Sequence, residues 1–329
     1  MEVKILREAE IRKCVGMTQE AVEAVELGFT RLAEGRVSLP PIIRVDVESH
    51  HGEVDVKTAY IEGLDSFAIK VASGFLNNPA IGLPYGSGMM VVMSAKTGFL
   101  EAVLLDNGYL TDLRTGIAGA IAAKHLAPSR VETAGVIGSG MQARYQIRGL
   151  RMMRPFKRLL VYGIDPDGVD RYITEMAEEL GVEVVKAGGP EEVVRQSRFV
   201  VTTTPSREPY LRAEWLHPGL HITAMGADGE HKEELFPEVI GKADRLACDS
   251  KTQCFRLGEL HHALKAGVIS QDTDITELGE LTGGRKIGRK TEEEITVCDL
   301  TGVGVQDTAI AVLSLQKALA QGLGTTLTV

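Results

Sequence analysis

The sequence lacks the signatures of several common classes of functional site. Its 329 residues include only four cysteines, which form no C-x-x-C pair: Cys14, Cys248, Cys254 and Cys298. We expect them to be small buried residues in a reducing compartment. The eight histidines contain no H-E-x-x-H motif, so no metal site is expected. A G-x-S-x-G turn and a Walker motif are also absent from the sequence, which argues against a serine hydrolase and a P-loop nucleotidase.

Long apolar runs and a positive net charge are missing as well. No stretch approaches the ~18 apolar residues of a membrane-spanning helix, and residues 1–4 are not typical of a signal peptide. Asp and Glu (45) outnumber Lys and Arg (36), for a net charge of −9. This balance argues against binding to nucleic acid or to an anionic membrane. We therefore expect a cytoplasmic protein with no nucleic-acid or membrane partner.

Glycine, in contrast, is frequent (36 residues), and one glycine turn is especially informative. The turn Gly138–Ala143 directly follows the apolar run Thr133–Ile137 and opens a predicted helix. Gly138 allows a tight turn, Gly140 allows backbone N–H groups to approach a pyrophosphate, and Ala143 allows close packing of helix on strand. Because G-x-G-x-x-A alone is a weak signal, the flanking strand and helix are what make this segment a predicted dinucleotide site.

The pattern of strands and helices predicts two domains. From about residue 130, short β-rich runs alternate with helical stretches, which predicts a parallel sheet. The expected strands of this part are Glu132–Ile137, Arg158–Tyr162, Val182–Val185, Phe199–Thr203, His221–Met225, Arg245–Cys248 and Ile295–Cys298.

The first 115 residues have a different sequence pattern, in which successive predicted strands are separated by clusters of Gly, Pro and Asn. The expected strands there are Ile42–Val47, Glu53–Tyr60, Phe67–Val71, Gly88–Met93 and Ala102–Leu105. Helices are expected at Gln19–Glu34, at Thr111–Leu126 and at Thr308–Gln321. We therefore predict an α/β protein in which a Rossmann dinucleotide-binding domain (116–307) is combined with an α+β substrate-binding and dimerisation domain (1–115 with 308–329).

One polar loop is a candidate for part of the catalytic site. Ligands of open α/β sheets bind at the carboxyl ends of the strands, and Gly226–Leu235 follows such an end. Its carboxylate Asp228 could act as a general acid or anchor an amine. Equally, Asp228 could only cap a following helix, because Asp is a favoured N-cap residue.

Several separated motifs together resemble one known family. They are Ile69–Lys70, Asp112–Thr115, Gly138–Gln142, Gly226–Asp228 with Lys232 and Leu235, and Asp299–Gly302 with Asp307. In this order they resemble the ornithine cyclodeaminase/μ-crystallin family over nearly the whole chain. Within that family, Gly52–Tyr60 and Leu104–Thr111 resemble the branch associated with ectoine utilisation.

The resemblance implies a homodimer that binds NAD(H) or NADP(H) in its Rossmann domain and a small amino or imino acid in its N-terminal domain. Family chemistry is hydride transfer at a carbon–nitrogen centre next to a carboxylate. Known members include cyclodeaminases, alanine dehydrogenases and ketimine or cyclic-imine reductases, together with a vertebrate protein that binds NADPH and thyroid hormone.

The resemblance also implies roles for individual residues. Arg44, Lys70 and Arg114 would bind the substrate carboxylate, and Lys70 and Asp228 would be catalytic. Gly138, Gly140, Met141 and Gln142 would line the pyrophosphate, and Thr115 and Lys232 would lie near the cofactor. These roles agree with the chemistry, because a carboxylate beside the imine nitrogen stabilises the iminium that accepts hydride. Cations, arginine above all, fix and orient a carboxylate.

Two departures from the family pattern bear on specificity. Cyclodeaminases acting on ornithine hold its distal ammonium with a Glu in the strand before the active-site lysine. Counting back from Lys70 puts Lys57 at about that place, with Asp55 nearby. We therefore expect Lys57 to contact the substrate, and the substrate to be acidic or short rather than ornithine.

The second departure concerns the cofactor. NAD-specific Rossmann domains usually end their second strand with an acidic residue that binds the ribose 2′-hydroxyl. Here Gly163 occupies that place and Asp165 follows two residues later. Asp165 either takes over this role, which slightly favours NAD over NADP, or only begins the next helix.

Three functions remain open from the sequence. An NAD(P)H-dependent imine reductase or amino-acid dehydrogenase leads, because Asp228 and the three cations are all present. A cyclodeaminase that recycles bound NAD⁺ would use the same site and release ammonia. A non-catalytic cofactor- or ligand-binding protein of the crystallin type is the third.

Overall fold

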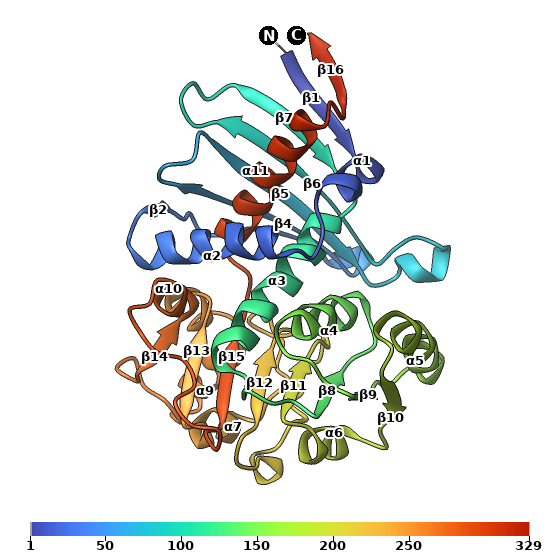
Figure 1. The fold of residues 1–329 in the computed structure, drawn as a ribbon, viewed down its shortest axis with the longest axis vertical. Coiled ribbons are helices and arrows are strands. Elements are labelled where there is room, and N and C mark those ends of the chain that lie inside the picture. Colours follow the sequence, from blue (N-terminus) through green and yellow to red (C-terminus); the bar gives the residue numbers. More distant parts are fainter. Residues whose placement is uncertain (1, 329) are drawn as a thin grey trace. The chain divides into compact units, whose positions relative to one another are not determined.

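A computed structural model describes residues 2–328, which fold as two units (Figure 1). The first unit combines Met1–Thr115 with Val303–Val329, and the second is Gly116–Gly302. Helix α3 (Tyr109–Leu126) begins in the first unit and continues into the second.

The first unit is built on an eight-stranded, largely antiparallel sheet in the order β16-β1-β7-β6-β5-β4-β2, with β3 paired to β4. Its strands are β1 (Glu2–Arg7), β2 (Val37–Ser38), β3 (Ile43–Val47), β4 (Gly52–Ile61), β5 (Ser66–Phe75), β6 (Gly86–Ser94), β7 (Leu100–Leu105) and β16 (Thr325–Thr328). Its other helices are α1 (Glu8–Cys14), α2 (Gln19–Ala33) and α11 (Gly304–Ala320), with short 3₁₀ turns at Glu48–His50 and Asn78–Ile81.

Helix α11 packs closely on one face of this sheet, beside α2 (Figure 1). The close approach depends on small residues: a Cβ on Gly304 would lie 2.3 Å from the Thr58 carbonyl oxygen. Thr308 Oγ1 donates to the Ala59 carbonyl (2.7 Å) and accepts from the Ala68 N–H (3.1 Å). Side chains alternate along a strand, so Ile69 and Val71 point to the face of the sheet opposite Ala68. Both are apolar and only partly buried.

The second unit has an all-parallel sheet in the order β10-β9-β8-β11-β12-β15-β13-β14, as expected for a Rossmann domain. Its strands are β8 (Thr133–Ile137), β9 (Arg158–Tyr162), β10 (Glu183–Lys186), β11 (Phe199–Thr202), β12 (His221–Ala224), β13 (Arg245–Cys248), β14 (Ile275–Glu277) and β15 (Thr296–Asp299). Its helices are α4 (Met141–Met153), α5 (Pro166–Leu180), α6 (Pro190–Gln196), α7 (Pro237–Lys242), α8 (Lys251–Cys254), α9 (Gly258–Lys265) and α10 (Leu278–Thr282), with a 3₁₀ turn at Ala213–Trp215.

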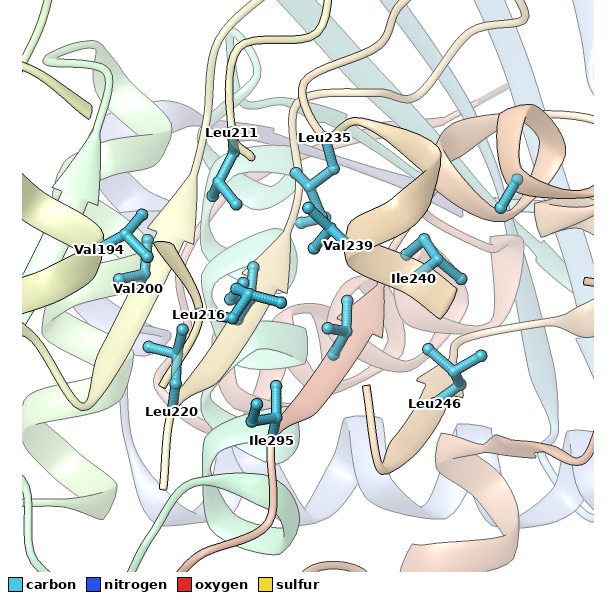
Figure 2. Packing of buried hydrophobic residues seen from close by; sticks show 14 of the residues in the cluster. Val194, Val200, Leu211, Leu216, Leu220, Leu235, Val239, Ile240, Leu246 and Ile295 are labelled. Atoms are coloured by element: carbon cyan, nitrogen blue, oxygen red, sulfur yellow. The ribbon is translucent and has the colours of Figure 1, made fainter. Parts of the chain in front are cut away.

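The α/β class with a Rossmann sheet and a second domain is thereby confirmed. A cluster of buried apolar residues on β11, β12, β13 and the adjoining helices forms the core of this sheet's central part (Figure 2). Leu211 and Leu235 lie at its edge, where the loops that follow β11 and β12 run side by side. Among residues 2–328 no helix is both long enough and apolar enough to cross a membrane.

Candidate active site

A buried ionic cluster lies in the first unit. Lys57 on β4, Lys70 on β5, Arg114 on α3 and Asp307 on α11 form it, and their exposed fractions are 7%, 2%, 5% and 0%. Asp307 Oδ1 lies 2.9 Å from Arg114 Nε and 3.4 Å from Lys70 Nζ. Both contacts are ion pairs whose geometry is poorly aligned for hydrogen bonding. Four separate elements therefore deliver their charges to one buried place.

Two buried cations of the cluster, Lys70 and Arg114, share one carboxylate, that of Asp307. Burial, helped by the charges of Arg114 and Lys57 and opposed by Asp307, lowers the pKa of Lys70 to about 7. Buried charges without enough counter-charge are costly. A carboxylate placed against Lys70 and Arg114 would supply the missing charge, so this group of residues fits a carboxylate-bearing ligand.

Asp106 supports this cluster, and sequence reasoning missed it. It follows β7, is 1% exposed, and its Oδ2 accepts the Leu110 N–H at 2.8 Å. The contact fixes the first turn of α3, the helix that carries Arg114. Burial, opposed by the backbone donors and by the charge of Lys70, raises the pKa of Asp106 to about 6. A signal was present in the sequence, because Asp between a strand and a helix is a favoured N-terminal capping residue.

Arg44 occupies a more acidic place than the resemblance implies. Its side chain pairs with Asp46 (3.0 Å), with Glu53 and, at 3.9 Å, with Asp55. In the register of the sheet Arg44 lies opposite Asp55, whereas Lys57 lies opposite Lys70. The charge of Arg44 is thus already compensated by carboxylates, and its role in carboxylate binding stays a prediction.

The glycine turn in the second unit has the geometry that a dinucleotide needs. Gly138 has φ +111°, and a Cβ there would lie 2.4 Å from Thr203 Oγ1. At Gly140, which precedes α4, a Cβ would meet nothing within 4 Å, so the backbone there is open to a ligand. Met141 and Gln142 form the first turn of α4, and Met141 is 56% exposed. This open helix N-terminus fits a pyrophosphate.

Gly163, at the end of β9 where an acidic residue is usual, lies in a tight place. A Cβ there would lie 3.0 Å from Val169 Cγ2 and 3.2 Å from Ser139 Oγ, so the glycine turn and helix α5 crowd this position. Asp165 precedes α5 with its side chain 62% exposed, and its Oδ2 lies 3.6 Å from Arg171 Nη2. Asp165 makes no side-chain capping bond, which leaves it available to a ribose hydroxyl.

Asp228 and Lys232 form an ion pair in the loop after β12. Lys232 Nζ donates to Asp228 Oδ1 at 2.6 Å, and the two side chains are 12% and 46% exposed, respectively. The alternative that Asp228 caps a helix is wrong, because the next helix, α7, begins only at Pro237. An exposed carboxylate in such a loop can exchange a proton with a ligand.

A buried carboxylate close to this loop also escaped sequence reasoning. Glu234 is 0% exposed and accepts hydrogen bonds from the loops after both β11 and β12. Its polar partners come from three separate segments, so no local pattern indicates it.

The histidines and cysteines of residues 2–328 form no group of three or more possible metal ligands. The sequence does contain a His217-x-x-x-His221 pair, but both residues have other partners. His221 is buried between Thr296 Oγ1 (2.7 Å) and Thr223 Oγ1 (2.9 Å), and His217 contacts backbone carbonyls. The four cysteines are buried free thiols.

The parallel sheet with its glycine turn, joined to an antiparallel-rich unit with a buried ionic cluster, defines a two-domain protein of the Rossmann class. The chain belongs to the ornithine cyclodeaminase/mu-crystallin family, whose model matches residues 1–322.

Three solved structures resemble the chain over nearly its whole length. The Δ¹-pyrroline-2-carboxylate reductase of Thermococcus litoralis, in complex with NADH and L-proline, is 32% identical with a TM-score of 0.93, covering 98% of this chain and 99% of that one. An archaeal alanine dehydrogenase dimer with bound NAD is 35% identical (TM-score 0.91; 100% and 99% covered). The iminosuccinate reductase of Paracoccus denitrificans with NAD⁺ is 28% identical (TM-score 0.91; 100% of both).

Proposed function

We propose that this protein is an NAD(P)H-dependent oxidoreductase that reduces the C=N bond of a small imino acid, as an imine reductase or an amino-acid dehydrogenase. The observation that carries the proposal is the buried ionic cluster, in which Lys70 and Arg114 share the carboxylate of Asp307 and Lys57 lies opposite Lys70. A carboxylate substrate is the ligand that balances these charges. The family relationship and the three NAD- or NADH-bound structures supply the reaction class.

Each group has a definite task in this reaction. Lys70 and Arg114 bind the α-carboxylate and orient the adjacent carbon. Asp228 exchanges the proton of the substrate nitrogen, since a protonated imine is the better hydride acceptor. Gly138, Gly140, Met141 and Gln142 would hold the pyrophosphate, and the nicotinamide cofactor supplies the hydride when bound. Thr115 and Lys232 are assigned to the cofactor's surroundings by the family resemblance.

NAD(H) is the favoured cofactor in this proposal. Gly163 carries no side chain, so Asp165 is the first acidic group that follows β9. Its carboxylate would accept a bond from the ribose 2′-hydroxyl and would repel a 2′-phosphate.

The substrate is an acidic or short imino acid. Lys57 is buried directly opposite Lys70, so a second substrate carboxylate would be attracted there and a distal ammonium repelled. An iminosuccinate reductase among the structural neighbours is in line with an acidic substrate. A role in ectoine utilisation rests on the resemblance of Gly52–Tyr60 and Leu104–Thr111 and stays a prediction.

A cyclodeaminase is the second candidate, and one observation favours it. Asp55 lies two residues from Lys57 on the same face of β4, with its side chain 21% exposed. It could hold a distal ammonium if Arg44, its partner at 3.9 Å, moved aside.

We also propose that the protein is a homodimer. The sheet face opposite Lys70 carries Ile43, Val45 and Met89, which are 63%, 52% and 38% exposed. Apolar side chains exposed together on one face mark a candidate interaction site, and the alanine dehydrogenase neighbour is a dimer. The variant Ile43→Lys should be monomeric by light scattering, whereas Phe99→Lys, equally exposed near the β6–β7 turn, should remain dimeric. A dimeric Ile43→Lys would exclude this face.

The function is tested by following nicotinamide absorbance with a panel of 2-keto acids plus ammonia, cyclic imino acids and diamino acids. Net oxidation of NADH or NADPH identifies a reductase. Cyclic product with ammonia release and no net oxidation identifies a cyclodeaminase, and tight cofactor binding without turnover identifies a binding protein.

A further inference from the structure

One buried carboxylate collects hydrogen bonds from three segments of the second unit. Glu234 Oε1 accepts from the Thr204 N–H, the Thr204 hydroxyl and the Tyr210 hydroxyl, each at 2.7 Å. Its Oε2 accepts from the Thr202 hydroxyl at 2.6 Å and the Gly226 N–H at 2.9 Å. Five donors thus meet at a carboxylate that is 0% exposed.

Glu234 is itself held rigidly in the chain. Its carbonyl oxygen accepts from the N–H groups of Tyr210 (2.9 Å) and Leu211 (3.0 Å). Its own N–H and that of Leu235 donate to the buried carboxylate of Glu259, at 2.9 and 3.1 Å. Leu211 and Leu235 are both anchored in the apolar core (Figure 2). The carboxylate of Glu234 is therefore a fixed point to which the neighbouring loops are attached.

The loop after β11, which Glu234 holds through Thr204, forms the wall behind the glycine turn. Thr203 precedes Thr204, and its hydroxyl donates to the Ile137 carbonyl at 3.2 Å. The same hydroxyl occupies the space beside Gly138 in which a Cβ would lie. A displacement of Thr204 would carry Thr203 with it and disturb the turn.

The loop after β12, which Glu234 holds through Gly226, carries Asp228. The Asp228 N–H donates to the Gly226 carbonyl at 3.1 Å, and Asp228 pairs with Lys232 further along the same loop. One carboxylate therefore fixes both the loop that carries the proposed acid and the loop that shapes the proposed pyrophosphate turn.

We infer that Glu234 is a positioning residue that holds the loop of Asp228 and the glycine turn in the arrangement needed for hydride transfer. The inference rests on the proposed function for its catalytic consequences, although the loop attachment itself does not depend on it. Glu234 is not a catalytic residue, because it acts through Thr204 and Gly226.

The chemistry of the donors requires a carboxylate at this position. Each carboxylate oxygen faces a backbone N–H, from Thr204 or from Gly226, and a backbone N–H can only donate. A glutamine has one acceptor oxygen and one donor NH₂ group, so in either orientation it would point an N–H at a backbone N–H. The variant Glu234→Gln would thus release one of the two loops while keeping the size and shape of the side chain.

The test compares Glu234→Gln with Val194→Ala. Val194 lies in the same apolar core (Figure 2) but is not among the residues that donate hydrogen bonds to Glu234. Its truncation therefore controls for a general loss of stability. Hydrogen exchange of the protein without ligand is followed at residues 203–206 and 226–232. We expect Glu234→Gln to exchange at least about tenfold faster in one of these loops, and Val194→Ala to match wild type there.

Two further readouts distinguish positioning from a structural role. The dissociation constant for NADH, from fluorescence titration, should rise severalfold in Glu234→Gln and stay unchanged in Val194→Ala. With an active substrate, kcat should fall about tenfold or more while the substrate KM changes less than about twofold, since Lys70 and Arg114 belong to the first unit. The inference would be overturned if Glu234→Gln kept the wild-type hydrogen exchange and NADH affinity. It would also be overturned if Val194→Ala, at an equal loss of Tm, changed both quantities as much as Glu234→Gln.

If only the proposed function is wrong, the wild-type protein will show slow hydrogen exchange at residues 203–206 and 226–232 but will turn over no substrate. If Glu234→Gln does not fold, the double variant Thr202→Val with Tyr210→Phe removes two hydroxyl donors and keeps both backbone donors. We expect it to exchange faster at Thr204 and Gly226 than wild type, and wild-type exchange at both would overturn the inference.

Discussion

Lys57 lies directly opposite Lys70 in the antiparallel register of β4 and β5, and both side chains are buried. Like charges in a cross-strand pair destabilise a sheet, so packing alone does not explain this pair. Asp307 compensates part of the charge through Lys70 and Arg114. We propose that Lys70 and Arg114, which share this one carboxylate, bind the negative charge of a substrate.

The first prediction concerns substrate choice. Lys57→Glu should lower kcat/KM for a dicarboxylic imino acid by about 10–100-fold, the value of about one charge-assisted hydrogen bond. Lys57→Met, which removes the charge without reversing it, should show a smaller loss. Steady-state assays on iminosuccinate-type substrates and on ornithine measure both effects, and efficient cyclisation of ornithine by wild type would refute the assignment of Lys57.

The second prediction is a pH dependence of substrate binding. Burial lowers the pKa of Lys70 to about 7, so its ammonium is charged below that pH and becomes neutral above it. KM for a carboxylate substrate should therefore be lowest below about pH 7 and rise as the pH increases, although bound carboxylate shifts the midpoint upward. Lys70→Met should give a high KM without this dependence, whereas the exposed control Lys96→Met should retain the wild-type profile. A wild-type KM that is flat between pH 6 and 9 would contradict the role of Lys70.

The third prediction concerns the stability of the second unit. Burial raises the pKa of Asp299 to about 8 from an ordinary 3.8. Between these pH values the folded state holds a proton that the unfolded state has lost, so the free energy of unfolding falls as the pH rises from about 4 to 8. Asp299→Asn should make this decline shallower, and Asp272→Asn, an exposed control, should not. Thermal unfolding at a series of pH values tests the difference; parallel curves for wild type and Asp299→Asn would count against it.

The fourth prediction addresses cofactor choice. Asp165→Ala should weaken NADH binding about 5–10-fold, because a charge-assisted bond to the ribose is lost. It should also strengthen NADPH binding, since Arg171 is released from its partner. Fluorescence titration of both nucleotides measures this, with Asp167→Ala as the control from the first turn of α5. Equal NADH affinity in both variants would remove Asp165 from the cofactor site.

Local patterns made much of the fold predictable. The strand–turn–helix order around Gly138 and the alternation of strands with helices depend on short-range signals, and the structure confirms the parallel sheet that they predict. Four strands were missed, namely β1, β2, β14 and β16, and two of them show why. β14 (Ile275–Glu277) has only three residues, and β1 (Glu2–Arg7) is defined by pairing with the distant strands β7 and β16.

Helix boundaries and buried polar residues were harder to predict. Helix α11 was predicted to begin at Thr308 but begins at Gly304. Its first turn lies so close to Thr58 that only a glycine fits at its start. Glu234 resembles any acidic loop residue in the sequence, because its donors Thr202, Tyr210 and Gly226 come from separate segments. The candidate site therefore needed tertiary contacts that no sequence window contains.

The central claim is that the buried ionic cluster binds the carboxylate of an imino acid that is reduced at the expense of NADH. The most direct measurement is the initial rate of NADH oxidation by wild type and Arg114→Met with small 2-keto acids plus ammonia or preformed imino acids. The account predicts net NADH oxidation, with amino acid formed in equal amount, and a loss of about 100-fold or more in kcat/KM for Arg114→Met. Cyclic product formed without net NADH oxidation, or equal rates for the two proteins, would contradict it.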